Sequence, residues 1–118
     1  MSTVVVLEDD LLFLSRIREA AGSARVRVVR TAAALVEACQ EDPEALVLAD
    51  LDSARLDAVA AIRALRAEPA LAQRQVIGFF SHVHADVGQA ALAAGASRVL
   101  TRGAFVGALP ALLAGRLE

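Results

Sequence analysis

Short apolar runs alternate five times with longer segments in which apolar residues recur every three or four positions. The short runs are rich in valine, leucine and isoleucine, which is typical of β-strands. Four of them are nearly continuous in apolar residues, as expected for strands buried on both faces of a sheet. Arg25–Arg30 instead alternates charged and apolar residues, which predicts an edge strand with one face in water. The predicted strands are Thr3–Leu7, Arg25–Arg30, Ala45–Asp50, Gln75–Phe80 and Ser97–Thr101.

The longer segments predict helices, and several of them carry residues that commonly begin or end a helix. Asp10 and Thr31 are suitable N-caps, because their side-chain oxygens can accept hydrogen bonds from the first free backbone N–H groups. Gly22 and Gly95 are typical helix ends, and Pro110 should lie near the first turn of the last helix or bend it. The predicted helices run from Asp10 to Gly22 and from Thr31 to about Gln40, and then over about Leu56–Ala67, Ala85–Ala94 and Ala104–Arg116.

This alternation of strands and helices predicts an α/β fold, a doubly wound five-stranded parallel sheet with five helices. A total of 118 residues suits one domain, spanning residues 1–118. An amphipathic second strand fits the flavodoxin-like strand order 2-1-3-4-5, in which the first and third strands are neighbours.

Acidic residues stand at the ends of these two neighbouring strands. Thr3–Leu7 is followed directly by three acids, and Ala45–Asp50 itself ends on one. Ligands of open α/β sheets bind at the carboxyl ends of the strands, so these carboxylates should share one pocket. They would repel one another unless a cation joined them, and Mg²⁺ prefers such oxygen ligands.

The alternative is that these acids only cap helices, where a carboxylate near the N-terminus gains about 0.3–1 kcal/mol. That explains Asp10 but does not explain Glu8 and Asp9, which precede the cap. The sequence therefore predicts a metal-binding pocket formed by Glu8, Asp9 and Asp50.

In order and separation, five motifs of the chain resemble those of a response-regulator receiver domain. The resemblance covers the full length, and each motif alone is weak. The matching pieces are Val4–Asp10, Leu46–Ser53, Arg55–Ala58, Val76–Ser81 and Ala93–Arg102.

The resemblance implies a role for each residue of the acidic pocket. Asp50 is implied as the phosphoacceptor, a carboxylate that attacks phosphorus and forms an acyl phosphate. Glu8 and Asp9 match the acidic pair that holds Mg²⁺ (or Mn²⁺), with Asp50 and the backbone carbonyl of Asp52 as further ligands. Ser81 stands where the family has a Ser or Thr that hydrogen-bonds the phosphoryl group; the alternative is a serine that caps a turn.

The phosphate side of the pocket departs from the family pattern. Arg102 and Gly103 replace the usual Lys and Pro, and without proline a cis bond would cost about 3 kcal/mol, so we expect a trans peptide. Arg102 can bind phosphoryl oxygens or instead hold Asp50 in a standing ion pair. His82 stands where the family has a small residue, and it either covers the pocket, modulating access to Asp50, or faces solvent.

Two further positions bear on signalling. Val99 replaces an aromatic residue that swings inward on activation in many receivers, so an aromatic switch coupled to Ser81 is not expected. Asp52 either adds negative charge near the incoming phosphoryl group or is a solvated loop acid. The remaining candidates are unremarkable: Cys39 is a packing residue, His84 a loop or helix-start residue, and one cysteine with two histidines makes no usual zinc site.

Composition excludes several classes of function. A net charge of −2 and the absence of Trp and Tyr argue against nucleic-acid binding. No apolar run approaches the roughly 20 residues of a membrane helix, and no signal segment opens the chain. A single cysteine, Cys39, cannot form an internal disulfide and fits a reducing compartment, the cytoplasm.

The sequence leaves three candidate functions. The first is a stand-alone receiver, not an enzyme, that takes a phosphoryl group on Asp50 from a histidine kinase or phosphotransfer protein and signals by contact with a downstream protein. The second is a pseudo-receiver that keeps the fold as a constitutive interaction module. A small flavin-binding protein is the third, and acids after the first strand, where a phosphate would bind, argue against it. A weak homodimer is left open.

Overall fold

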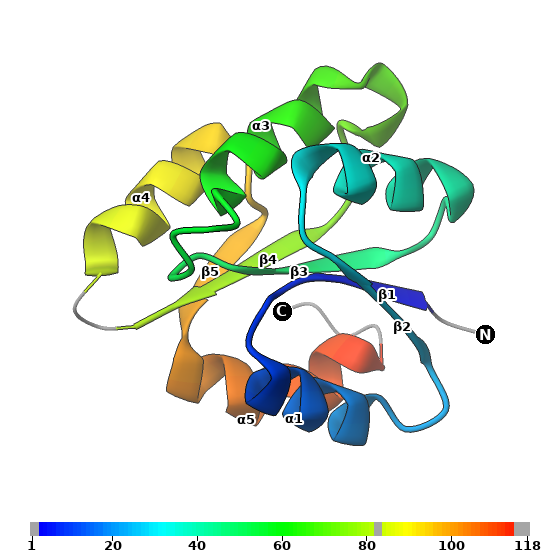
Figure 1. Ribbon diagram of the computed structural model, residues 1–118, viewed down its shortest axis with the longest axis vertical. Helices are drawn as coiled ribbons and strands as arrows, with labels where there is room; N and C mark the ends of the chain where they lie inside the picture. Colours follow the sequence, from blue (N-terminus) through cyan, green and yellow to red (C-terminus); the bar gives the residue numbers. More distant parts are fainter. Residues whose placement is uncertain (1–2, 82–83, 115–118) are drawn as a thin grey trace.

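The computed structural model describes residues 3–81 and 84–114, with the predicted alternation of strands and helices (Figure 1). The strands are β1 (Thr3–Leu7), β2 (Arg25–Val29), β3 (Leu46–Asp50), β4 (Val76–Phe80) and β5 (Arg98–Thr101). The helices are α1 (Leu11–Ala21), α2 (Ala32–Glu41), α3 (Ala58–Ala67), α4 (Ala85–Ala94) and α5 (Arg102–Leu113), and a 3-10 helix η1 (Pro69–Leu71) follows α3. The predicted elements are all present. Their ends match the prediction or differ from it by at most two residues, except that α5 ends at Leu113 and its predicted end at about Arg116 lies outside the described residues.

The five strands form one parallel sheet in the order β2-β1-β3-β4-β5, which confirms the predicted topology. In the pairing of β1 with β3, Leu7 lies opposite Ala49. The residues that follow these two, Glu8 and Asp50, therefore leave the sheet side by side at its carboxyl edge.

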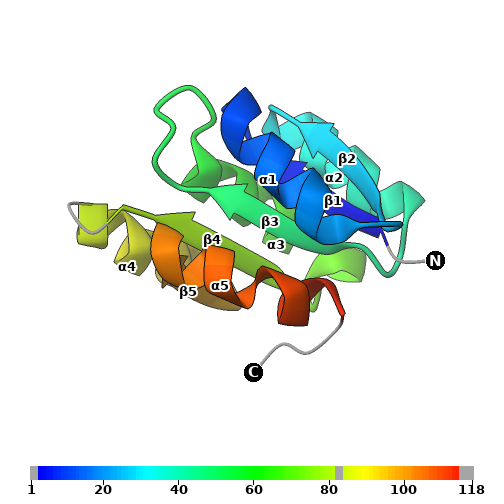
Figure 2. The ribbon, with the colours of Figure 1, turned by 90° about the horizontal axis from the view of Figure 1, so that it is seen from below.

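Helices cover both faces of the sheet (Figures 1 and 2). Helices α1 and α5 lie on one face, over a core cluster that includes Phe13, Phe79 and Phe105. Helices α2, α3 and α4 lie on the other face, over a cluster built mainly from aliphatic side chains. Within the described residues, none of the helices is long and apolar enough to cross a membrane.

The two edge strands differ from the three central ones in burial. β2 lies at one edge and is mostly half-exposed, as its alternating sequence predicts. The prediction that Ser97–Thr101 is buried on both faces is wrong, because β5 forms the opposite edge and all four of its residues are half-buried.

Local interactions explain where most helices begin and end. The Asp10 side chain accepts hydrogen bonds from the N–H groups of Leu12 (3.0 Å) and Phe13 (3.2 Å), and Thr31 caps α2 in the same way. Gly95 ends α4 with a φ of 118°, a left-handed conformation that favours glycine.

Two boundary predictions need correction. α3 begins after Asp57 and not at Leu56, because the Asp57 side chain caps it from a left-handed conformation. α5 begins at Arg102, two residues earlier than predicted, so Pro110 lies beyond its first turn; that Pro110 bends the helix stays a prediction.

Candidate functional site

The carboxyl ends of β1 and β3 bring three acids together. Glu8, Asp9 and Asp50 each offer a carboxylate oxygen, and these oxygens lie within 4.8 Å of one another. The two strands are neighbours with Leu7 opposite Ala49, so the pairing of the sheet itself produces this cluster. The predicted convergence of these three acids is confirmed.

Glu8 is the most deeply buried of the three, with no side-chain surface exposed to solvent. Its Oε2 accepts hydrogen bonds from the backbone N–H groups of Asp9 (3.1 Å) and Asp10 (3.2 Å). Its Oε1 is buried and has no hydrogen-bond partner among the described residues. Burial, and then the neighbouring Asp50 carboxylate, raise the pKa of Glu8 to about 9. A buried carboxylate oxygen without a partner, beside a second carboxylate, fits a site for a divalent cation.

Asp9 is oriented from the loop that follows β3. The Ser53 hydroxyl donates a hydrogen bond of 3.1 Å to Asp9 Oδ2. The contact shows that Ser53 takes part in the site, although the sequence assigns it no role.

Asp50 is held by two donors and is almost closed to solvent. Its Oδ1 accepts a hydrogen bond from the backbone N–H of Asp52 (2.8 Å), and its Oδ2 accepts one from Arg102 Nη2 (2.9 Å). Only 3% of its side chain is exposed. Its role as phosphoacceptor stays a prediction. The two hydrogen bonds fix the orientation of the Asp50 carboxylate.

Arg102 joins two carboxylates at once. Its Nη2 binds Asp50 and its Nε donates to Asp52 Oδ2 (3.0 Å). The guanidinium lies 4.7 Å from the centre of the Phe13 ring and 5.4 Å from that of Phe79, in the range of cation–π contacts. Burial alone would lower its pKa, but the hydrogen bond to Asp52 and the charge of Asp50 outweigh burial and raise it.

Two expectations for the end of β5 concern the peptide after Arg102 and the partner of Arg102. The described residues contain no cis peptide bond, so the trans peptide expected after Arg102 is confirmed. Of the two arrangements considered for Arg102, the structure has the standing ion pair with Asp50.

Asp52 differs most from its sequence-based interpretation. Its carboxylate accepts hydrogen bonds from the backbone N–H of Ser81 (3.0 and 2.9 Å) and from Arg102, and His84 Nδ1 lies 2.9 Å from Oδ1. Only 14% of its side chain is exposed, so its interpretation as a solvated loop acid is wrong. Burial by itself would raise its pKa, but the Ser81 N–H, His84 and Arg102 together lower it. The predicted metal contact through its backbone carbonyl stays a prediction.

The remaining predicted residues follow β4 and β5. Ser81 lies at the carboxyl end of β4, as predicted, and its backbone N–H faces Asp52. His84 precedes α4 but also reaches Asp52, a contact that no sequence signal indicated. Val99 is half-buried against the aliphatic core cluster. His82 lies outside the described residues, so its effect on access stays a prediction.

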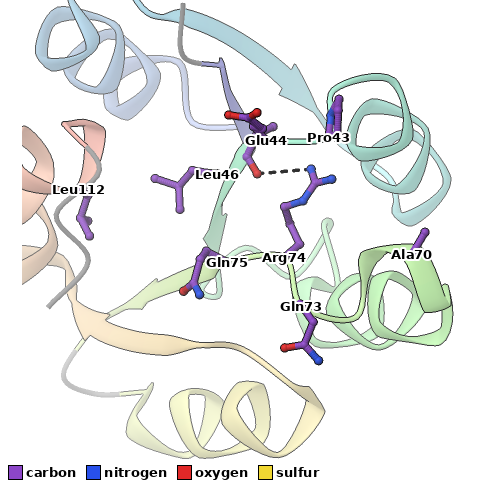
Figure 3. A pocket seen from close by; sticks show the side chains of 9 residues that line it. Pro43, Glu44, Leu46, Ala70, Gln73, Arg74, Gln75 and Leu112 are labelled. Atoms are coloured by element: carbon purple, nitrogen blue, oxygen red, sulfur yellow. Dashed lines mark hydrogen bonds between the residues drawn. The ribbon is translucent and has the colours of Figure 1, made fainter.

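A pocket of about 400 Å³ lies at the opposite, amino-terminal end of β3 and β4 (Figure 3). Arg74 stands at its edge, where it donates hydrogen bonds to the backbone carbonyls of Asp42 (2.8 Å), Ala45 (3.4 Å) and Cys39 (3.1 Å). The Arg74 guanidinium therefore holds backbone carbonyls at and just after the end of α2.

Several known structures share the fold of this protein over nearly the whole chain. A response regulator from Hahella chejuensis is 20% identical, with 100% of this chain and 96% of that chain covered and a TM-score of 0.82. The chemotaxis response regulator CheY4 of Vibrio cholerae is 13% identical, with 99% of each chain covered and a TM-score of 0.79. The Mn²⁺-bound form of response regulator Rcp1 is 16% identical, with 100% and 96% covered and a TM-score of 0.76. No protein-family model matches the sequence, and no curated protein matches it either.

The sheet order and the acids at its carboxyl edge define a doubly wound, flavodoxin-like α/β protein. Within that class, the chain has the fold of response-regulator receiver domains. The motifs of the sequence predicted this fold, and the structural comparison confirms it.

Proposed function

We propose that residues 1–118 form one receiver-like signalling domain, and that Asp50 accepts a phosphoryl group from a histidine kinase or phosphotransfer protein. The convergence of Glu8, Asp9 and Asp50 at one point of the sheet edge is the observation that carries this proposal. A modified Asp50 would change the surface around it and so the affinity for a downstream protein.

The acidic cluster fits Mg²⁺ or Mn²⁺. Glu8, Asp9 and Asp50 would hold the ion, and the partnerless Oε1 of Glu8 is the atom that such an ion would satisfy. A structural neighbour, response regulator Rcp1, was solved in an Mn²⁺-bound form. When bound, a divalent cation neutralises charge on the phosphoryl oxygens during transfer.

The protein groups around Asp50 would perform the transfer as follows. A carboxylate oxygen of Asp50 attacks phosphorus while the bond from phosphorus to the leaving oxygen of the donor breaks, which yields an acyl phosphate and the free donor. Asp52 N–H orients Asp50 through the hydrogen bond to Oδ1. Arg102, paired with Asp50 Oδ2, offers the positive charge that a phosphoryl group on Asp50 would need.

Acetyl phosphate with Mg²⁺ tests this proposal directly. We expect a mass gain of one phosphate per chain that is stable in acid, labile in base and absent in Asp50→Asn. Asp86→Asn is the matched control, because Asp86 is an exposed acid in the first turn of α4 and should leave the gain unchanged. Wild-type protein that gains no phosphate and binds no beryllofluoride would overturn the proposal.

A second candidate, the pseudo-receiver, is favoured by one specific observation. Asp50 is 3% exposed and paired with Arg102, which is how a carboxylate would be held if it were purely structural. This candidate predicts that Asp50→Asn leaves partner binding intact, whereas the phosphoacceptor proposal predicts that binding depends on phosphorylation. A pull-down of one partner by wild-type and Asp50→Asn protein, with and without acetyl phosphate, distinguishes the two.

A further inference from the structure

The Asp52 carboxylate lies in the position of a bound anion. Three donors from two parts of the chain converge on it: the Ser81 N–H and the His84 Nδ1 in the connection between β4 and α4, and the Arg102 Nε at the start of α5. The Ser81 N–H contacts both carboxylate oxygens, at 3.0 and 2.9 Å. Donors that converge in this way on one carboxylate form an anion-binding site that the chain itself fills.

One of these donors, Arg102, also binds Asp50. Arg102 binds Asp50 Oδ2 with Nη2 at 2.9 Å and Asp52 Oδ2 with Nε at 3.0 Å, so one guanidinium serves both carboxylates. The backbone N–H of Asp52 also binds Asp50, which ties the two residues together. Any doubly charged group attached to Asp50 would need these donors and would be repelled by a carboxylate that already holds them.

We propose that the Asp52 side chain is an internal anion that occupies the phosphoryl-binding donors of the resting protein, and that it must leave them before Asp50 can be phosphorylated. This inference rests on the proposed function of Asp50. Asp52 thereby acts as an autoinhibitory latch: it lowers the rate of phosphoryl transfer and the affinity for phosphoryl analogues.

The position of Asp52 allows such a movement. It lies in the segment between β3 and α3, outside regular structure, and its side chain is 14% exposed, against 3% for Asp50. His84, which holds it from the outer side, is 50% exposed. A turn of the Asp52 side chain toward water therefore frees Arg102 and the Ser81 N–H without a change in the sheet.

The test compares the initial rate of Asp50 phosphorylation in wild type, Asp52→Ala, Asp52→Asn and the control Asp86→Asn. Acetyl phosphate with saturating Mg²⁺ is the donor, intact mass gives the early rates, and beryllofluoride affinity is measured in parallel. We expect Asp52→Ala to be at least about tenfold faster, a change that corresponds to about 1.4 kcal/mol of barrier. Asp52→Asn, which keeps the shape without the charge, should be accelerated less, and Asp86→Asn should match wild type.

Each outcome decides between the two proposals. Equal rates in wild type and both Asp52 variants overturn the latch and leave the phosphoacceptor function in place. Transfer that is detectable in wild type and at least about tenfold faster in Asp52→Ala supports both the latch and the phosphoacceptor function. No transfer in any variant overturns both proposals together.

The NMR signal of the Ser81 amide proton tests the contact with Asp52 directly and does not depend on the rates. In wild type, the Ser81 amide proton should resonate downfield, as expected for an N–H bonded to a carboxylate, and Asp52→Ala should shift it upfield. An unchanged Ser81 resonance in folded Asp52→Ala protein would overturn the latch whatever the rates.

Discussion

Arg102 is the residue on which the charge balance of the site depends. Among the described contacts, it is the one guanidinium that binds both Asp50 and Asp52. Glu8 adds no negative charge at neutral pH, because its pKa of about 9 keeps it protonated. A lysine could not easily replace it, because a single ammonium group lacks the two separated donors that reach two carboxylates.

Arg102→Ala should therefore destabilise the metal-free protein. It leaves the buried Asp50 and the mostly buried Asp52 without their cation, and we expect the free energy of unfolding to fall by about 2–3 kcal/mol. Denaturant unfolding measures this loss. Arg63→Ala, at an exposed position of α3, is the control and should change stability by less than about 0.5 kcal/mol. Equal stabilities would show that the ion pairs contribute nothing.

Glu8 predicts how stability depends on pH in the absence of metal. Its pKa is about 9 in the folded protein, against an ordinary value of 4.5, so between these values the folded state holds a proton that the unfolded state has lost. The contribution of Glu8 to stability is fully present below pH 4.5 and declines as the pH rises toward 9, by up to about 1.4 kcal/mol per pH unit.

Comparison with Glu8→Gln isolates this contribution, because the amide keeps the shape but does not titrate. In EDTA, the stability of wild type relative to Glu8→Gln should fall between pH 6 and pH 8. A difference that is independent of pH over this range would contradict the raised pKa.

At the scale of the element, two glycines explain where α4 ends and where a substitution could stabilise α5. Gly95 has a φ of 118°, and a Cβ there would lie 2.7 Å from Arg66 Cγ, so both backbone and space require glycine. Gly107 lies inside α5, where a Cβ would meet nothing within 4 Å.

The two glycines should respond in opposite directions to the same substitution. Gly95→Ala should destabilise the protein by about 1–3 kcal/mol, because alanine resists a left-handed conformation and Arg66 must move. Gly107→Ala should stabilise it by up to about 1 kcal/mol through helix propensity. Thermal unfolding of both variants measures the pair, and two shifts of the same sign would contradict this explanation.

At the scale of the molecule, the acidic cluster exists only when the chain is folded. Glu8 and Asp9 follow β1 and Asp50 ends β3, some 40 residues further along the chain, and only the pairing of these strands brings their oxygens within 4.8 Å. A cation that binds there binds the folded state and not the unfolded one, so site occupancy and global stability are linked.

Mg²⁺ or Mn²⁺ should accordingly raise the free energy of unfolding. At a metal concentration 100 times the dissociation constant, the gain should be about 2.7 kcal/mol. Asp9→Asn should remove most of this gain, whereas Asp86→Asn should retain it. Titration of the unfolding midpoint with each metal gives the result, and a midpoint that does not respond in wild type would argue against a metal site.

The order of elements could be predicted almost completely from the sequence. Strand and helix periods, the caps Asp10 and Thr31 and the alternating pattern of Arg25–Arg30 are local properties, and the structure has them where the sequence places them. The strand order followed from general rules of parallel sheets, and with it the meeting of Glu8, Asp9 and Asp50. The burial of β5 was predicted wrongly because apolar content alone does not distinguish an edge strand from a central one.

Only the tertiary structure decided what the side chains of Asp52, His84 and Arg102 do. They come from three segments after β3, β4 and β5, and neither spacing nor periodicity relates an acid at position 52 to a guanidinium fifty residues later. The sequence by itself determined a receiver-like sheet with acids at its carboxyl edge, because hydrophobic periodicity is a local property and general rules of parallel sheets then fix where the strand ends meet. The contacts of Asp52 with the Ser81 N–H, His84 and Arg102 depend on distances that exist only after the sheet has formed.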